Sequence, residues 1–519
     1  MSRSYGATFN FSSVVRRHAE RLGEREAIAD VASGRRFTWA ELDRRVDATA
    51  AALRDSGIGR GDVVGLLLYN CPEFIETVFA VNRIGAVFLP LNWRLAQDEV
   101  RYILEHAQAR ALVTEGAFFP VVEPVTGRLA ELRTRFALDD APPDGWMSFG
   151  RAVAAANGAR VADAEVGADE LHRLMYTSGT TAHPKGVMLS YANLYWKNLA
   201  HILEFGITRD DRTLIVGPLY HVGALDLPGT GTLHAGGSWV ILPKFDATQV
   251  LTAIQAERPT NVWLAPAMIN LLLNDPAVGE HDLSSVRFII DGGEKMPIPL
   301  IRKLQAAFPN AHFADAYGLT ETVSGDTFLD KASVIDKIGS VGRPVAHLEL
   351  RVMDDDGRDV PADATGEIVL RGPKVFKGYW RDPESTAKAI DADGWFHTGD
   401  IGRLDPDGYL YIVDRKKDVI ISGGENIASL EVERVLYENA AVLECAVVGK
   451  PDARWGEVPV AFVALRPGQT STAEALIASC DGKLARFKIP REVRFIDALP
   501  RNPSGKVLKR SLRDGLRTA

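Results

Sequence analysis

The chain has 519 residues, of which 46% are hydrophobic and 25% charged, a globular composition that argues against fibrous and low-complexity classes. Its net charge of −8 lacks the basic signature of a nucleic-acid-binding protein. The scattered cysteines Cys71, Cys445 and Cys480 exclude a disulfide framework and fit a reducing compartment. No apolar run approaches the length of a membrane span, and the N-terminal residues lack the apolar stretch of a secretory signal. We therefore expect a cytoplasmic protein.

Apolar runs that resemble strands alternate with amphipathic segments along most of the chain. Residues 62–70 (DVVGLLLYN) are typical of a buried strand, residues 71–85 of an amphipathic helix, and residues 86–92 of the next strand. This β-α-β alternation predicts a layered α/β core with parallel strands.

The C-terminal part has a different pattern. Residues 404–415 (LDPDGYLYIVDR) predict a hairpin with an Asp-Gly turn, and a charge run follows at 414–418. Later segments predict a small α+β domain; they are a helix near 429–439, strands at 444–449 and 458–465, a helix near 473–484 and a strand at 491–497. We place the domains at 1–414 and 415–519. From Asp414 onward, 18 Lys and Arg face 14 Asp and Glu, a net +4. Such a unit suits a polyanionic ligand or is simply a solvated surface.

A segment rich in hydroxyl side chains, YTSGTTAHPKGVMLS, spans residues 176–190. Hydroxyls and backbone N–H groups at a glycine-rich turn can bind phosphate oxygens, and a lysine adds a positive charge. The segment is not a Walker A loop, because Pro184 precedes Lys185 and Gly186 follows it. Taken alone, such a cluster is more often an ordinary loop.

Further motifs occur in a fixed order after this segment. They are IIDGGEKMP (289–297), YGLTET (317–322), GWFHTGD (394–400), DRKKDVIISGGEN (414–426) and PRNPSGK (500–506). The ordered set resembles the adenylate-forming superfamily, in its branch of AMP-dependent acyl-CoA synthetases, over nearly the whole chain. The resemblance implies an α/β fold, with a large multi-subdomain N-terminal domain of layered sheets and a small mobile α+β C-terminal domain. It also implies ATP, Mg²⁺ and coenzyme A.

The resemblance assigns the phosphates and the metal to particular side chains. Glu321 would bind Mg²⁺, Thr320 would contact the α-phosphate, and Lys506 would stabilise the charge that moves during adenylation. The β- and γ-phosphates would be bound by Thr177, Ser178, Gly179, Thr180, Thr181 and Lys185. Ala182 stands where the family usually has glycine. Each residue taken singly also has an ordinary structural interpretation, such as an exposed turn for Lys506.

The nucleoside and the CoA arm have their own implied residues. Adenine would be bound by Gly292, Gly293, Glu294, Asp315 and Tyr317, and the ribose by Asp400 and Arg415. Lys417 matches the hinge about which the small domain rotates between the two half-reactions. Gly423 and Gly424 would then let the pantetheine arm pass close to the backbone.

The acyl group is the least defined part. The resemblance places its pocket near His221, Val222, Leu225, Gly292, Gly318, Val323 and Ser324, and Trp263 is a further candidate. No Lys or Arg stands out there as a partner for a second carboxylate, so we expect a fatty, aryl or polycyclic acid.

Other functions stay open at this stage. The acyl-adenylate could pass to a carrier protein instead of CoA, or the chain could be a nucleotide-binding regulator without catalysis; light-emitting oxidation is more distant. A homodimer is also left open. The sequence lacks G-x-S-x-G, H-E-x-x-H and C-x-x-C motifs, so a serine hydrolase or a zinc site is not supported.

Overall fold

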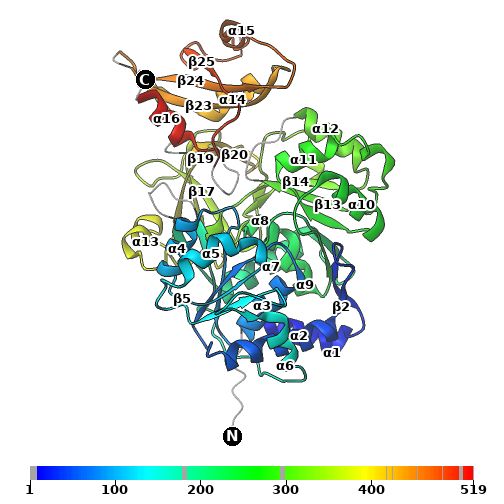
Figure 1. The fold of residues 1–519 in the computed structure, drawn as a ribbon. Coiled ribbons are helices and arrows are strands. Elements are labelled where there is room, and N and C mark those ends of the chain that lie inside the picture. The colour runs from blue at the N-terminus through cyan, green and yellow to red at the C-terminus, as the bar shows by residue number, and fades with distance from the viewer. Residues whose placement is uncertain are drawn as a thin grey trace. The chain divides into compact units, whose positions relative to one another are not determined.

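The computed structural model describes residues 9–177, 184–292, 298–415, 418–422, 425–452, 454–481, 483–501 and 507–517. Its contacts divide the chain into two compact units (Figure 1). Unit 1 comprises Met1–Glu349 with Arg371–Gly394, and unit 2 comprises Leu350–Leu370 with Trp395–Ala519. The sequence placed a domain boundary between residues 414 and 415, and that boundary stays a prediction.

Unit 1 contains a seven-stranded sheet in the order β7-β6-β5-β3-β4-β8-β9. Its strands are parallel except for the β8–β9 hairpin. Their bounds are β3 (Val63–Leu67), β4 (Val87–Pro90), β5 (Ala109–Thr114), β6 (Thr134–Ala137), β7 (Met147–Ser148), β8 (Leu171–Thr177) and β9 (Lys185–Ser190). Every residue of β3 is buried, as the apolar run predicts, and the β-α-β unit from residue 62 to 92 is confirmed.

A nine-stranded sheet, in the order β16-β15-β14-β13-β12-β10-β11-β1-β2, completes the unit. Its central strands are parallel, and antiparallel strands lie at both edges. The bounds are β1 (Glu26–Asp30), β2 (Arg36–Thr38), β10 (Arg212–Ile215), β11 (Ser238–Ile241), β12 (Asn261–Trp263), β13 (Phe288–Gly292), β14 (His312–Tyr317), β15 (Thr327–Phe328) and β16 (Arg343–Pro344).

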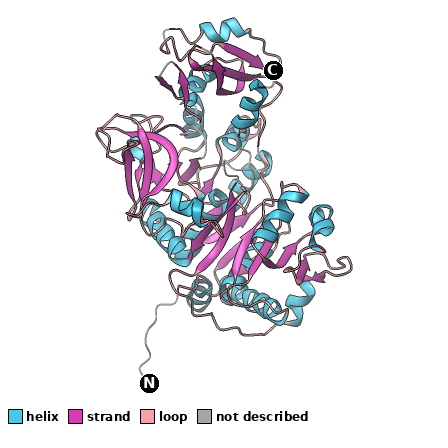
Figure 2. Cartoon of the chain, turned by 90° about the vertical axis from the view of Figure 1, so that its left-hand side faces the viewer, coloured by secondary structure: helices cyan, strands magenta, loops and turns pink. Residues whose placement is uncertain are grey.

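Helices pack against the strands of unit 1 (Figure 2). They are α1 (Ser12–Leu22), α2 (Trp39–Asp55), α3 (Pro72–Arg83), α4 (Gln97–His106), α5 (Phe119–Thr126), α6 (Phe149–Ala155), α7 (Tyr191–Phe205), α8 (Val222–Leu225), α9 (Gly231–Ala235), α10 (Ala247–Glu257), α11 (Pro266–Leu273), α12 (Ile298–Ala307) and α13 (Pro383–Ala389). Local signals set several starts: Pro72 occupies the first turn of α3, and Ser190 with Asn193 forms a capping box on α7.

Unit 2 holds two further sheets. One is antiparallel in the order β17-β18-β19-β20, with β17 (Glu349–Met353), β18 (Gly366–Arg371), β19 (Phe396–Leu404) and β20 (Leu410–Arg415). The other joins β21 (Ile420–Ser422), β22 (Glu425–Ile427), β23 (Val442–Asp452), β24 (Gly456–Leu465) and β25 (Glu492–Phe495), with helices α14 (Ser429–Tyr437), α15 (Ala473–Ala478) and α16 (Lys509–Arg517).

The elements predicted for the C-terminal part are mostly confirmed. The hairpin β19–β20 turns at Gly408, whose φ of 81° suits glycine, and the strands and helix that follow are present. The helix expected to 484 ends at Ala478, where Ser479, Cys480 and Asp481 are poor helix formers. The α/β fold class, with a large N-terminal part of layered sheets and a smaller C-terminal part, is confirmed.

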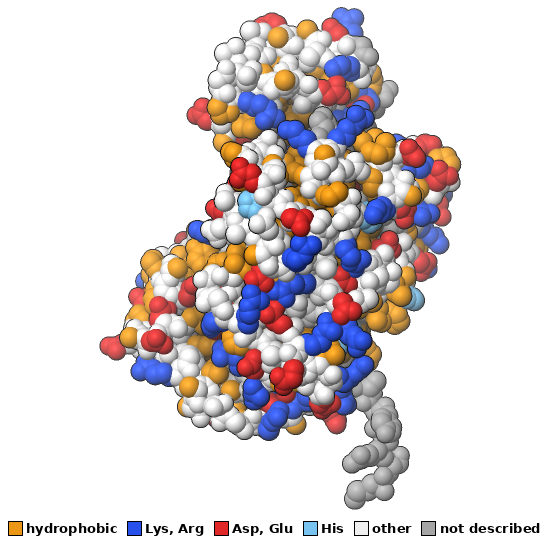
Figure 3. All heavy atoms as spheres, turned by 90° about the vertical axis from the view of Figure 1, so that its right-hand side faces the viewer, with side chains coloured by type: hydrophobic (Ala, Val, Ile, Leu, Met, Phe, Trp, Pro, Cys, Tyr) orange, Lys and Arg blue, Asp and Glu red, His pale blue; other side chains and the backbone are white. Residues whose placement is uncertain are grey.

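The surface of unit 1 carries charges of both signs. On the face drawn in Figure 3, Lys and Arg side chains are interleaved with Asp and Glu.

Candidate active site

The hairpin β8–β9 carries the two described ends of the hydroxyl-rich segment. Thr177 lies directly opposite Lys185 across the hairpin. The Lys185 ammonium donates a hydrogen bond to Ser385 Oγ at 2.8 Å and lies 4.8 Å from the centre of the Tyr379 ring. Strand pairing therefore fixes the residues on both sides of the turn of this segment, Thr177 and Lys185. Ser178, Gly179, Thr180, Thr181 and Ala182 lie outside the described residues.

Glu321 lies within reach of the same tyrosine. The Tyr379 hydroxyl donates to Glu321 Oε1 at 3.0 Å, and the backbone N–H of Phe376 donates to the Glu321 carbonyl at 2.7 Å. Burial, followed by the nearby Glu321 carboxylate, raises the pKa of Tyr379, so this phenol stays protonated as a donor. The structure thus brings Lys185, Tyr379 and Glu321 together, with Thr320 beside Glu321 in the short 3₁₀ turn Thr320–Thr322.

Tyr379 was missed by the sequence analysis. The available signal was FKGYW at residues 376–380, an aromatic pair directly after a glycine. Gly378 has a φ of 125°, and a Cβ there would lie 2.5 Å from the Thr386 side chain. The close approach that brings Tyr379 to Glu321 therefore depends on a glycine.

The residues predicted to surround adenine lie at the carboxyl ends of β13 and β14. Gly292 pairs with Ala316, and a Cβ at Gly292 would lie 2.6 Å from the Ala316 carbonyl oxygen, so glycine is required. Asp315 is 5% and Tyr317 9% exposed. The edge where parallel strands end is the usual position for a nucleotide in open α/β sheets. Gly293 and Glu294 lie outside the described residues.

Asp291 is a second carboxyl group beside Asp315. The two aspartates are register partners on neighbouring strands, and Asp291 is fully buried. Burial and then the Asp315 charge raise the pKa of Asp291 well above its usual range. Two neighbouring carboxylates cannot both ionise cheaply, so Asp291 is the protonated member of the pair.

The loop after β14 contains three of the residues predicted to lie near the acyl group. Gly318 is exposed, whereas Val323 and Ser324 are buried. A Cβ at Gly318 would lie 2.3 Å from the Gly325 N atom, which shows how tightly the loop closes on itself. Val323, Ser324 and Gly325 have φ values of 59°, 61° and 63°.

His221 stands at the start of α8, where its Nδ1 accepts a hydrogen bond from the Gly223 N–H at 3.0 Å. Its ring stacks on Trp263, with 5.8 Å between ring centres and 28° between planes. A Cβ at Gly217 or Gly223 would lie 2.7 or 2.8 Å from the indole, so both glycines make room for it. Val222 and Leu225 are buried, while Trp263 is 8% exposed.

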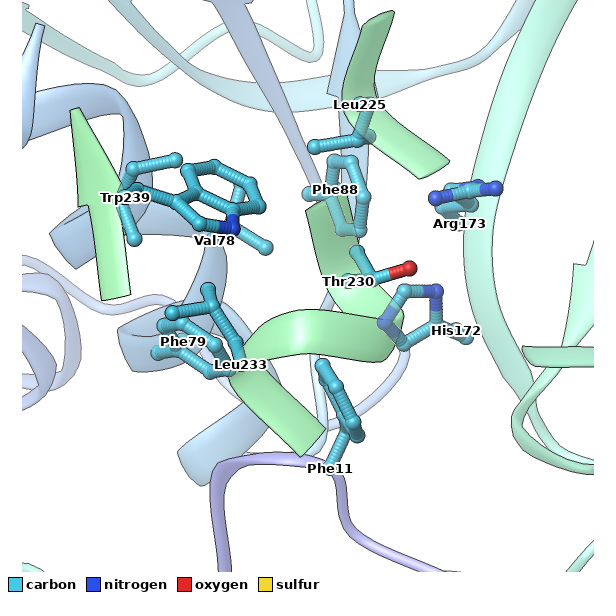
Figure 4. Close-up of a pocket in the computed structure, with 11 residues that line it drawn as sticks. Phe11, Val78, Phe79, Phe88, His172, Arg173, Leu225, Thr230, Leu233 and Trp239 are labelled. Carbon is cyan, nitrogen blue, oxygen red and sulfur yellow. The ribbon is translucent and has the colours of Figure 1, made fainter. Parts of the chain in front are cut away.

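Leu225 faces an enclosed cavity of about 10 Å³ (Figure 4). Aromatic and aliphatic side chains surround this space together with His172 and Arg173. Among the described residues, neither ring nitrogen of His172 has a hydrogen-bond partner, and burial lowers the pKa of His172 well below its usual value. A space of this size holds one water molecule at most. The cavity is therefore part of the core rather than a substrate site.

Asp400 and Arg415, both predicted to serve the ribose, lie opposite each other on β19 and β20 of unit 2. Arg415 Nε is 3.6 Å from Asp400 Oδ1, and Asp400 is 9% exposed. The pairing of these two residues follows from the hairpin. Lys417, Gly423, Gly424 and Lys506 lie outside the described residues.

Two searches of the described residues, for metal-binding clusters and for membrane-spanning helices, gave negative results. In the described ranges, no group of three or more His, Cys, Asp or Glu is placed to hold a metal ion. No described helix is long and apolar enough to cross a membrane.

The chain is similar to known protein families, curated proteins and solved structures. The model of the AMP-binding enzyme family matches residues 15–380, and the model of the AMP-binding enzyme C-terminal domain matches residues 431–506. The indoleacetate–CoA ligase of Aromatoleum aromaticum is 41% identical, covering 92% of this chain and 93% of its own. The feruloyl-CoA synthase of an Amycolatopsis species is 40% identical, covering 92% and 94%. The crystal structure of the anthranilate CoA ligase AuaEII with anthranoyl-AMP has a TM-score of 0.90, 27% identity, and coverage of 98% and 97%.

Proposed function

Because this chain belongs to the AMP-binding enzyme family, in its branch of adenylate-forming acyl-CoA ligases, we propose that it activates a largely apolar carboxylic acid with ATP and transfers the acyl group to CoA. A carboxylate oxygen attacks the α-phosphorus of ATP, and pyrophosphate leaves. The CoA thiol then attacks the acyl carbonyl carbon, AMP leaves, and the thiol proton passes to solvent.

The observation that carries this proposal is the group formed by Lys185, Tyr379 and Glu321 at the foot of the hydroxyl-rich segment. Negative charge accumulates on phosphate oxygens during adenylation, and fixed donors and cations stabilise it. Lys185 and Thr177 supply a cation and a hydroxyl there. We assign the β- and γ-phosphates to this segment and the α-phosphate to Thr320.

Glu321 fits a magnesium ion, because Mg²⁺ in nucleotide sites typically takes one or two carboxylates together with substrate phosphates and water. The Tyr379 hydroxyl binds Glu321 Oε1, and a carboxylate has about four lone-pair sites in all, enough for a hydroxyl donor and a metal ion together. When bound, the ion would offset charge on the phosphates. Glu321 would hold it in place.

The nucleoside is assigned by residue chemistry. Asp315 accepts from the adenine amino group, Tyr317 and the Gly292 backbone cover its faces, and Asp400 with Arg415 serves the ribose hydroxyls. The cross-strand pairing of Asp400 with Arg415 supports this last role. Lys417 as hinge, and Gly423 with Gly424 as the passage for pantetheine, rest on the motif positions alone.

The stacked pair of His221 and Trp263 supports an acyl group that contains an aromatic ring. The named relatives act on indoleacetate, ferulate and anthranilate, three aromatic acids. Fatty and polycyclic acids complete the panel that tests this choice.

The direct experiment measures pyrophosphate exchange over this panel, and then thioester formation with free CoA or with a phosphopantetheine-bearing carrier protein. We expect exchange with an aromatic acid and transfer to CoA. If the acyl group passes only to the carrier protein, the carrier and not CoA is the acceptor. If no acid supports pyrophosphate exchange, the chain is better explained as a non-catalytic regulator.

Lys506→Ala tests the catalytic assignment. Loss of the cation that stabilises the adenylation transition state should slow adenylation by about 10²–10³-fold, and thioester formation from supplied acyl-adenylate should change less than about threefold. Lys483→Ala is the matched control, since Lys483 is exposed and paired with Glu438 at 2.8 Å. Equal losses in both half-reactions would refute this role for Lys506.

A further inference from the structure

The loop from Gly318 to Asp326 has an unfavourable backbone geometry. Val323, Ser324 and Gly325 are three consecutive residues in the left-handed region, with φ from 59° to 63°. A β-branched residue such as Val323 rarely adopts this conformation, so the surroundings must stabilise it. Residues in such conformations concentrate at functional sites.

We propose that Lys374 is the positioning residue that holds this loop in its active geometry, an inference that rests on the proposed function. The Lys374 ammonium donates to the carbonyl oxygens of Ser324 at 2.9 Å and Gly325 at 2.6 Å. It also lies 2.9 Å from Asp326 Oδ1. Three oxygen atoms from consecutive residues thus surround a single cation with three N–H donors.

Asp326 connects this cation to the middle of the loop and to the residue that precedes it. Its Oδ2 accepts a hydrogen bond from Thr322 Oγ1 at 2.5 Å, and its backbone N–H donates to the Tyr317 carbonyl at 2.7 Å. Asp326 is fully buried and Lys374 is 2% exposed. In such surroundings an ion pair is costly to leave half-formed, so removal of the lysine would release the residues that it holds.

Lys374 is itself held from the opposite side. The Asn193 side-chain amide donates to the carbonyls of Pro373 at 2.9 Å and Val375 at 2.8 Å, the residues on either side of Lys374. Asn193 also belongs to the capping box of α7. The backbone on both sides of Lys374 is therefore held by a helix that does not belong to the loop.

The other half of the loop has separate supports. The Phe376 N–H and the Tyr379 hydroxyl both bind Glu321, and neither contact involves Lys374. Loss of Lys374 should therefore disturb Val323 and Ser324, on the acyl side, more than Thr320 and Glu321, on the phosphate side. This separation gives a kinetic signature that a general loss of stability would not produce.

The test compares wild-type enzyme with Lys374→Met. We expect the KM for the acid to rise by about tenfold or more and the KM for ATP to change by less than about threefold. Amide hydrogen exchange of Ser324 and Asp326 should accelerate by about tenfold or more, while the amides of α1, α2 and α3 keep their rates. Lys377→Met is the matched control, because Lys377 is exposed and its ammonium donates to the Asp169 carbonyl at 2.7 Å, away from the loop residues that Lys374 binds.

A folded Lys374→Met protein with unchanged acid KM and unchanged local exchange would overturn the proposal. If that variant does not fold, Lys374→Gln and Asp326→Asn are judged by the same two criteria, since each removes one charge and keeps a polar group. The exchange measurement needs no turnover. Suppose that the wild-type protein is inactive with every acid, but that Lys374→Met still accelerates exchange at Ser324 and Asp326. This result would count against the proposed function and not against the role of Lys374 in holding the loop.

Discussion

Arg83 and Lys197 are both fully buried cations of unit 1, but their surroundings differ. Arg83, at the end of α3, contacts Asp43 at 2.7 Å and Asp47 at 2.8 Å, and its Nε donates to the Ser12 hydroxyl. We call Arg83, Asp43 and Asp47 the helix cluster. Arg16 and Arg160 also contact these carboxylates, each at 3.1 Å, so the two aspartates bind several planar guanidinium groups.

Two cations, Arg173 and Lys374, and one carboxylate, Asp226, act on the charge of Lys197. Its ammonium donates to the Asp226 carbonyl and to Thr230 Oγ1, but the Asp226 carboxylate is 3.8 Å away and binds Arg173 at 2.6 Å. Burial, opposed by Asp226 and reinforced by the nearby cations Arg173 and Lys374, lowers the pKa of Lys197 to about 7. The comparison contrasts a buried arginine that directly contacts two carboxylates with a buried lysine whose nearest carboxylate binds another cation.

The largest effect is expected from breaking the helix cluster. Arg83→Met removes the fully buried cation and leaves Asp43 and Asp47 with the more exposed Arg16 and Arg160. This should lower the free energy of unfolding by about 3 kcal/mol, the lower end of the cost of breaking a buried ion pair. Urea denaturation at pH 7.5 measures the loss, and the folded fraction should keep its kcat. A loss below about 1 kcal/mol would mean that water or other cations satisfy the two carboxylates.

Contacts between neighbouring strands of a hairpin could be predicted from the sequence, but the contacts of the buried cations could not. Asp400 and Arg415 lie on the two strands of a hairpin whose Asp-Gly turn is visible in the sequence, although a register shift between Ile401 and Gly402 completes their pairing. Lys374, by contrast, binds a carbonyl 50 positions away. Its partner depends on how α7 and the loop pack, and no spacing rule connects them. Tyr379 escaped prediction for the same reason.

The pH dependence of stability gives the next effect. The pKa of Lys197 is lowered from 10.5 to about 7 on folding, so between these values the unfolded chain binds more protons. The unfolding free energy should therefore rise with pH above 7 by up to about 1.4 kcal/mol per unit from this group, and level off below 7. The pKa of Lys374 is also lowered, by burial, and adds to the same trend.

Urea midpoints at pH 7, 8 and 9 measure this slope. Lys197→Met should flatten it, and the exposed Lys377→Met should leave it as in the wild type. An identical slope in Lys197→Met would place the titration on another group and remove the contrast with Arg83.

The smallest effect on the free energy of unfolding is expected from an exposed ion pair, which serves as a reference for Arg83 and Lys197. Arg17 and Glu20 form an ion pair at 3.3 Å on α1, with side chains 75% and 58% exposed. Glu20→Ala should change the unfolding free energy by less than about 0.5 kcal/mol, because water screens the pair. A thermal melt is sufficient to check it, and a larger loss would show that exposure does not separate this pair from the buried ones.

The packing of Trp263 against two glycines has a consequence for changing the acid preference of this enzyme. The indole occupies space left by Gly217 and Gly223, positions at which a methyl group would collide with it. A mutation at either glycine would tilt or expel the ring without altering the tryptophan itself. Directed evolution of acid preference should therefore randomise Gly217 and Gly223. A library limited to residues whose side chains contact the acid would omit both glycines.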